Sequence, residues 1–116
     1  MKRLIVAALA LCAAQALAEQ KHGIEIYPAA KADAATAKMI KDTMKMDADT
    51  YRTTDSVAKV TEFYRKQGGL KENPGSDNKG SSFMGKGTML TIQNPWADMA
   101  TGKMNNDTLI SIVKQK

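Results

Sequence analysis

The chain has 116 residues, of which 43% are hydrophobic and 25% are charged, and its formal net charge is +5. A chain of this length forms one domain with a modest core and has no material for a second core. Acidic and basic residues are interleaved without a block of five like charges, which indicates a solvated surface and argues against nucleic acid as a partner.

The first 18 residues have the three parts of a secretory signal peptide. Lys2 and Arg3 supply positive charge, an unbroken apolar run follows, and Ala16-Leu17-Ala18 is a small-x-small cleavage site. The apolar run is shorter than the ~20 residues that a membrane-spanning helix needs, and no later stretch approaches that length. We therefore expect cleavage near Ala18, so that residues 1–18 are removed. Residues 19–116 are then a single periplasmic or secreted α+β domain with no transmembrane segment.

The only cysteine, Cys12, falls within this signal. The exported domain would therefore have no disulfide, no thiolate metal ligand and no cysteine nucleophile. Lipid attachment at Cys12 is an alternative, because apolar residues precede it. Leu11 is, however, bulkier than the small residue that usually comes before a lipidated cysteine.

Three elements are predicted before residue 54. The segment Ile24-Glu25-Ile26-Tyr27 alternates between apolar and polar residues and stops at Pro28, as in a short edge strand. A helix is predicted over about 33–45, because apolar residues recur there at helical spacing and Asp33 can cap its start. A short strand is expected to end at Tyr51-Arg52-Thr53.

The second predicted helix has the clearest pattern in the chain. Thr54 or Asp55 is expected to cap its start, and Gly68-Gly69 is expected to stop it because glycine adopts the left-handed conformation of a helix end. Its apolar stripe consists of Val57, Val60, Phe63 and Tyr64.

Loops and strands are predicted for the C-terminal half. Residues 70–80 are rich in Pro, Gly, Ser, Asp and Asn, a composition typical of a loop. Strands are expected at residues 81–84, 89–93 and 109–113, and the last is apolar on both faces except at Ser111, which favours a central position. Together the elements predict an α+β fold: two helices packed on one face of a small, mostly antiparallel four- or five-stranded sheet.

A long connection over residues 94–107 contains the only tryptophan, Trp96. Long loops in compact domains are frequently functional, and tryptophan can bury a large area against a partner. We predict a partner-binding surface here, formed by Asn94, Trp96, Met99 and Met104. The alternative is that Trp96 folds back and covers the sheet, because a small core needs large side chains.

Seven methionines remain after removal of the signal, and Met44-Lys45-Met46 places two of them one residue apart. Thioethers are soft ligands that favour Cu(I), and a thiol-free exported protein would rely on them for such a metal. Met44, Met46 and His22 are therefore a possible soft-metal site. Against this, methionine also fills irregular cores and forms adaptable surfaces for partner proteins.

The acidic residues give weaker indications. Asp47-Ala48-Asp49 offers oxygens to a hard cation, but calcium needs six to eight of them and no matching loop follows, so a solvated turn is expected. The chain has few residues suited to acid–base catalysis. Its sole histidine, His22, lies close to the expected new N-terminus, and chain termini are usually mobile. Paired carboxylates such as Asp55 and Glu62 could serve as acid and base, so a small enzyme is an alternative. No catalytic residue is assigned.

Two tyrosine-containing segments form a recognisable pattern. The first is Ile26-Tyr27-Pro28-x-Ala30. The second runs from Tyr51-Arg52-Thr53-Thr54-Asp55-Ser56-Val57 through Lys59-Val60 to Phe63-Tyr64. Together they resemble a pattern, YPxA followed by YRTxDSVxKVxxFY, in small exported bacterial α+β proteins of unknown function. The usual form has glycine where this chain has Ala29. The resemblance implies a compact α+β fold and export, and it implies no catalytic residue.

The export signal and the missing catalytic set predict an exported, non-enzymatic binding protein without a cofactor. Its expected partner is an envelope protein or a small ligand. The two alternatives are soft-metal (copper) binding through Met-x-Met and a small carboxylate-dependent enzyme.

Overall fold

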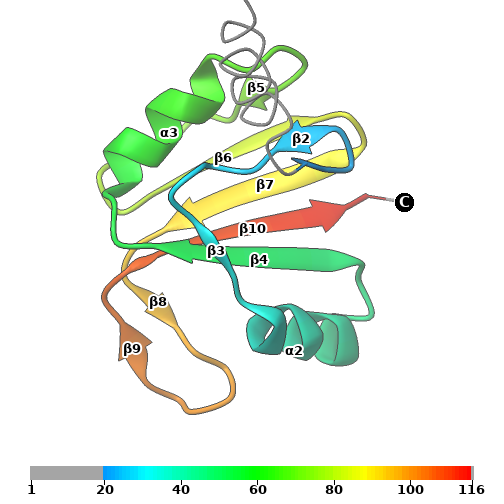
Figure 1. Cartoon of the computed structure of the whole chain (residues 1–116), viewed down its shortest axis with the longest axis vertical. Coiled ribbons are helices and arrows are strands. Elements are labelled where there is room, and N and C mark those ends of the chain that lie inside the picture. Colours follow the sequence, from blue (N-terminus) through cyan, green and yellow to red (C-terminus); the bar gives the residue numbers. More distant parts are fainter. Residues whose placement is uncertain (1–19, 116) are drawn as a thin grey trace, which may run out of the picture.

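The computed structural model describes residues 20–115, which form two helices, a six-stranded antiparallel sheet and two small hairpins (Figure 1). The α+β class predicted from the sequence is confirmed. The predicted signal peptide and Cys12 lie outside the described residues. Neither helix within residues 20–115 combines the length and the apolar composition that a membrane span requires.

The large sheet has the strand order β3-β4-β10-β7-β6-β5, and its neighbouring strands are antiparallel. In that order the strands are β3 (Lys31–Ala32), β4 (Ala48–Thr53), β10 (Thr108–Lys114), β7 (Thr88–Gln93), β6 (Gly80–Gly85) and β5 (Lys71–Glu72). Strand β10, the last strand in the chain, has a central position, as predicted. The sheet has six strands rather than four or five, because the edge strands β3 and β5 have two residues each and are too short to show a periodicity.

Helix α3 (Val57–Arg65) packs against β6 and β7, and its predicted stripe residues Val57, Val60 and Tyr64 are almost completely buried. They form one core with side chains of β7 and β10, including Leu90, Ile92, Ile110 and Ile112. The helix cap differs from the prediction. Ser56, rather than Thr54 or Asp55, accepts the hydrogen bond from the backbone N–H of Lys59, at 3.2 Å.

Helix α2 (Ala34–Met44) starts as predicted, because the Asp33 carboxylate accepts a hydrogen bond from the backbone N–H of Thr36 at 3.1 Å. It packs against β4, whereas α3 packs against β6 and β7, so the two helices lie toward opposite edges of the sheet (Figure 1). The contacts thus place the helices over different strands, and their packing on one common face stays a prediction. The apolar stripe of α2 is too thin to cover a core, since Ala37 is its only buried residue.

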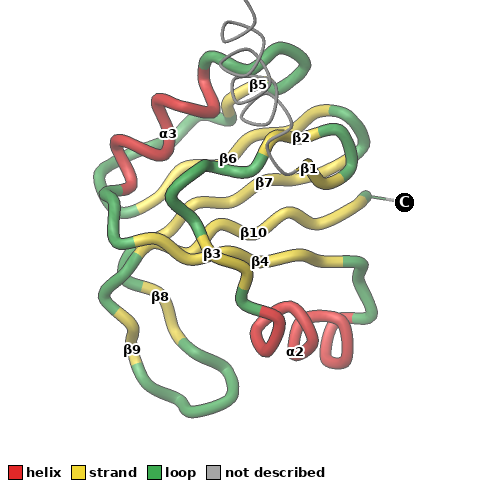
Figure 2. Tube along the Cα trace, viewed as in Figure 1, coloured by secondary structure: helices red, strands yellow, loops and turns green. Residues whose placement is uncertain are grey.

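Two short hairpins complete the fold (Figure 2). The first pairs β1 (Gln20–Lys21) with β2 (Ile24–Glu25), so the predicted edge strand is shorter than expected and lies outside the large sheet. The second pairs β8 (Trp96–Ala97) with β9 (Met104–Asn105), and it gives the long connection between β7 and β10 a regular structure.

The two segments of the tyrosine pattern pack against each other. The backbone N–H of Tyr27 donates to the hydroxyl of Tyr64 at 3.0 Å, and the Tyr27 hydroxyl donates to Asp55 Oδ2 at 2.6 Å. The rings of Tyr27 and Phe63 meet edge to face with centroids 5.3 Å apart. Burial, together with the bond to Asp55, raises the pKa of Tyr27 to about 12. These contacts assign the pattern a role in building the core.

Candidate functional site

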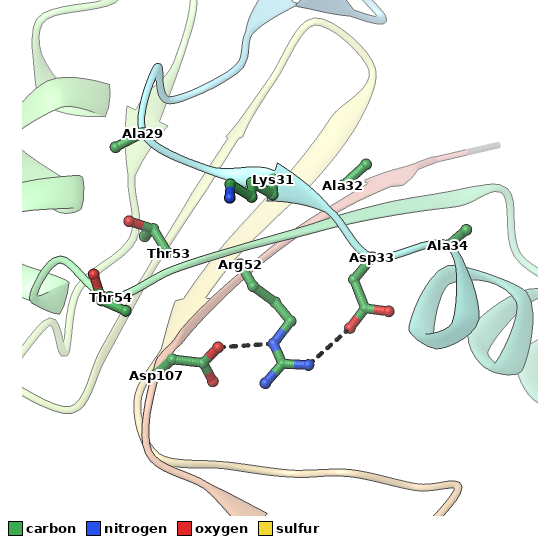
Figure 3. A pocket seen from close by; sticks show the side chains of 9 residues that line it. All are labelled: Ala29, Lys31, Ala32, Asp33, Ala34, Arg52, Thr53, Thr54 and Asp107. Atoms are coloured by element: carbon green, nitrogen blue, oxygen red, sulfur yellow. Dashed lines mark hydrogen bonds and ion pairs between the residues drawn. The ribbon is translucent and has the colours of Figure 1, made fainter.

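A cluster of charged side chains lies where β4 ends and β10 begins. Arg52 on β4 is opposite Leu109 in the sheet register, and Asp107 directly precedes β10. Arg52 Nε donates to Asp107 Oδ2 at 2.7 Å, while Arg52 Nη1 lies 3.7 Å from Asp33 Oδ2. Figure 3 shows the guanidinium group held between these two carboxylates. The antiparallel register thus joins charges that are 55 residues apart in the chain.

The buried side chain of Trp96 contacts both Asp107 and Arg52. This side chain is only 2% exposed, and its indole Nε1 donates to Asp107 Oδ1 at 2.8 Å. The guanidinium carbon of Arg52 lies 5.0 Å from the centre of the Trp96 ring, which is the geometry of a cation–π contact. Burial by itself raises the pKa of Asp107, but the hydrogen bonds from Arg52 and Trp96 outweigh it and lower this pKa overall. Asp107 is therefore a stable anion that fixes the position of Arg52.

Asp33 forms the opposite wall and is equally restrained. Besides capping α2, its carboxylate accepts a bond from the Thr36 hydroxyl at 2.7 Å. Its backbone carbonyl accepts a bond from the Thr50 hydroxyl at 2.6 Å. These bonds fix the start of α2 against β4. The position of the Asp33 carboxylate relative to Arg52 of β4 is therefore set by the fold.

These elements enclose an open pocket of about 520 Å³. Lys31 and Arg52 contribute cationic groups and two threonines contribute hydroxyls, while three alanines supply short apolar walls (Figure 3). Lys31 makes no ion pair within residues 20–115, so its ammonium group can meet a ligand. The pocket is lined by Ala29, Lys31, Ala32, Asp33, Ala34, Arg52, Thr53, Thr54 and Asp107.

The residues predicted for partner binding belong to the connection between β7 and β10 and do not line this pocket. Trp96 is folded back and buried, which is one of the two placements that the sequence left open. Asn94 has a structural position, because its side-chain amide donates to the Thr108 hydroxyl at 3.1 Å. Met99 and Met104 are exposed. Met99 shares with Arg52 the lining of a second cavity of about 230 Å³. A binding role for this set remains a prediction.

The residues predicted for a soft metal lie elsewhere. His22 occupies the turn between β1 and β2, where its Nε2 atom faces the carboxylates of Asp47 and Asp49. Met44 ends α2 and is 58% exposed, and Met46 follows in the loop that leads to β4. The groups facing His22 are thus oxygen donors, and copper binding through the two sulfurs remains a prediction.

Sequence reasoning did not find Arg52, Asp107 or Asp33 as one cluster. The available signals were a charged residue inside a predicted strand and an aspartate directly before the last strand. Neither signal identifies its partner, because the pairing depends on which strands become neighbours.

Comparison with known proteins adds no assignment: no family model, no curated protein and no solved structure matches this chain.

Proposed function

We propose that this chain is an exported, non-enzymatic binding protein whose pocket around Arg52 receives a small ligand bearing a carboxylate. Its volume of about 520 Å³ lies within the range of pockets that take small molecules. Short alanine walls suit a small apolar body. Asp33 and Asp107 also line the pocket and are paired with Arg52, so Lys31 supplies the unpaired positive charge for one anionic end.

The observation that carries this proposal is the fixed guanidinium group of Arg52. Asp107 accepts a hydrogen bond from its Nε, and the Trp96 ring centre lies 5.0 Å from its Cζ. Its Nη2 makes no hydrogen bond within the described residues. An arginine that is already oriented loses little conformational entropy when it binds a carboxylate. Lys31 in the same pocket adds a second positive charge for the anion.

The same contacts favour binding over acid–base catalysis. The lowered pKa of Asp107 keeps this carboxyl group ionised near neutral pH, so it cannot serve as a general acid. Of the two carboxylates that the sequence offered for an enzyme, Asp55 accepts a bond from Tyr27 and Glu62 lies 3.2 Å from Arg65. A carboxylate-dependent enzyme is therefore the weaker proposal.

The test is an NMR titration of the purified chain with acetate, succinate and citrate. Backbone amide signals of residues 31–34 and 52–54 are expected to move together as one of these anions saturates the pocket. Lys31→Gln should weaken that binding about fivefold, since it removes one charge-assisted contact from an exposed position. Lys38→Gln, on the surface of α2, is the matched control and should leave the affinity unchanged.

Two results would overturn the small-ligand proposal. The first is that no carboxylate moves these signals at concentrations up to about 10 mM, where even weak ligands bind. The second is an equal affinity for the wild type and Lys31→Gln.

An envelope protein as the partner is the second form of the binding proposal. The 51% exposed Met99 and the 59% exposed Met104 on the β8–β9 hairpin favour it. The double change Met99→Ser and Met104→Ser would then weaken cross-linking to that partner while leaving carboxylate binding intact.

A further inference from the structure

Three side chains from separate parts of the chain converge at the tip of the β1–β2 hairpin. His22 Nε2 lies 3.7 Å from Asp49 Oδ2 and 4.0 Å from Asp47 Oδ2. One ligand atom from each of the three residues lies within 4.8 Å of the others. The side chains of His22 and Asp49 are mostly buried, at 22% and 23% exposure, whereas that of Asp47 reaches the surface at 55%.

The nitrogen at the centre of this cluster has no hydrogen-bond partner among residues 20–115. His22 Nε2 is shielded from solvent and makes no hydrogen bond within the described residues. Both carboxylate oxygens are too far away for a hydrogen bond, whose heavy atoms lie about 2.7–3.2 Å apart. A buried polar atom without a hydrogen-bond partner lowers the stability of the folded chain. A bound cation between this nitrogen and the two carboxylates would satisfy all three groups.

The surrounding backbone holds the three residues in place. His22 and Gly23 both have positive φ, of 56° and 81°, and form the two-residue turn that joins β1 to β2. The carbonyl of Gly23 accepts a bond from Lys86 Nζ at 2.9 Å, which ties the hairpin to the β6–β7 turn. Asp49 is a residue of β4, and the carbonyl of Asp47 accepts a bond from the backbone N–H of Lys114 at 2.9 Å.

We propose that His22, Asp47 and Asp49 bind one divalent transition-metal ion, of which Zn²⁺ is the representative. Two carboxylates and a neutral imidazole match a charge of +2, and one nitrogen with two oxygens is a donor set that Zn²⁺ accepts. Adjacent ligands of a tetrahedral zinc lie about 3.4 Å apart, given bonds near 2.1 Å. The ligand atoms lie within 4.8 Å of one another, with His22 Nε2 3.7 Å from Asp49 and 4.0 Å from Asp47, so binding needs a contraction. The exposed Asp47 side chain can supply the largest part of it.

This site differs from the soft-metal site that the sequence suggested. It shares His22, but it replaces the two thioethers with carboxylates, which favour borderline and hard cations over Cu(I). Three protein ligands leave at least one coordination position for water. Because His22 is in the hairpin and Asp49 is in β4, the ion would join the N-terminal hairpin to the large sheet and stabilise the folded chain.

The experiment uses the purified chain without a polyhistidine tag, treated with EDTA and then titrated with ZnCl₂. His22 is the only histidine, so its ring signals in the NMR spectrum are identified without further assignment. They are expected to shift as zinc binds. At zinc concentrations far above Kd, the thermal midpoint should rise by about 10 °C.

His22→Asn is the key variant, because asparagine tolerates the positive φ of this turn and should preserve the hairpin. It should abolish the thermal shift without lowering the midpoint of the metal-free protein. Asp49→Asn should weaken zinc binding at least tenfold. Asp42→Asn, which changes an exposed carboxylate on α2, is the matched control and should bind zinc normally.

Either of two outcomes would overturn the proposed site. In the first, zinc leaves the ring signals of His22 unmoved. In the second, the zinc response survives Asp49→Asn but disappears after Met44→Leu and Met46→Leu, which would transfer the site to the thioethers. Both outcomes leave the proposal for the Arg52 pocket untouched, because the two sets of residues do not overlap.

Discussion

Tyr64 shows, at the scale of a single residue, how a polar group is used inside this small core. Its side chain is fully buried, and its hydroxyl accepts the bond from the backbone N–H of Tyr27. Burial is the main cause that raises the pKa of this hydroxyl. Its ring also packs against Phe63 and Phe83, with centroids 5.0 and 6.4 Å away. Helix α3 is thereby joined to the segment that follows β2.

Tyr64→Phe is expected to destabilise the fold by about 1–3 kcal/mol, because it leaves the buried N–H of Tyr27 without an acceptor. The free energy of unfolding in urea measures this change. Tyr27→Phe is the companion variant and should have a smaller effect, since it frees an Asp55 carboxylate that water can reach. A Tyr64→Phe protein as stable as the wild type would contradict the role assigned to this bond.

At the scale of elements, the start of α3 shows tertiary contacts overriding a local preference. Asp55 is a good helix-capping residue type, but its carboxylate accepts the Tyr27 hydroxyl and its carbonyl accepts the Thr108 hydroxyl at 2.6 Å. Its backbone N–H donates to the Thr53 hydroxyl at 3.2 Å. With Asp55 bound to two distant segments and to the neighbouring Thr53, the cap position passes to Ser56.

Ser56→Ala should therefore destabilise the protein by about 1 kcal/mol, the usual effect of removing a serine cap. Thr54→Ala, at a position that the sequence offered as the cap, should change the stability by less than about 0.5 kcal/mol. Chemical denaturation of both variants checks the assignment. The reverse order of effects would place the cap at Thr54.

At the scale of the whole molecule, two ion pairs connect different elements of the fold. Arg52 joins β4 to Asp107 before β10, and Arg65 joins α3 to Glu72 of β5 with Nε 2.6 Å from Oε1. The bonds from Arg65 and Ser76 lower the pKa of Glu72 to about 2, and that of Asp107 is also lowered. Both carboxylates thus have a lower pKa in the folded chain than in the unfolded chain.

Such groups contribute stability above the pKa of the unfolded state and lose it as the pH falls through the folded pKa. The urea midpoint should therefore be constant above about pH 5 and fall steadily between about pH 5 and pH 2. The double variant Glu72→Gln and Asp107→Asn should start lower at neutral pH and fall less steeply. Asp42→Asn is the control and should keep the wild-type slope, and an unchanged slope in the double variant would refute the linkage.

The predictability of the elements followed their length. Helix α2, the apolar stripe of α3 and strand β10 were predictable because each repeats its pattern over several residues. The two-residue strands β3 and β5 were not, since their hydrogen bonds depend on a neighbouring strand. The positions of the two helices over the sheet depended on the same long-range pairing.

The sequence alone determined the α+β class, the main helices and strands and the central place of the last strand, because these follow from local periodicity and propensity. The tertiary structure alone decided the two candidate sites. Arg52 meets Asp107 only through the register of β4 and β10, and His22 meets Asp49 only because the N-terminal hairpin folds toward β4. The type of a charged residue can be read from the sequence. The residue with which it pairs depends on which strands become neighbours, and this is a property of the whole chain.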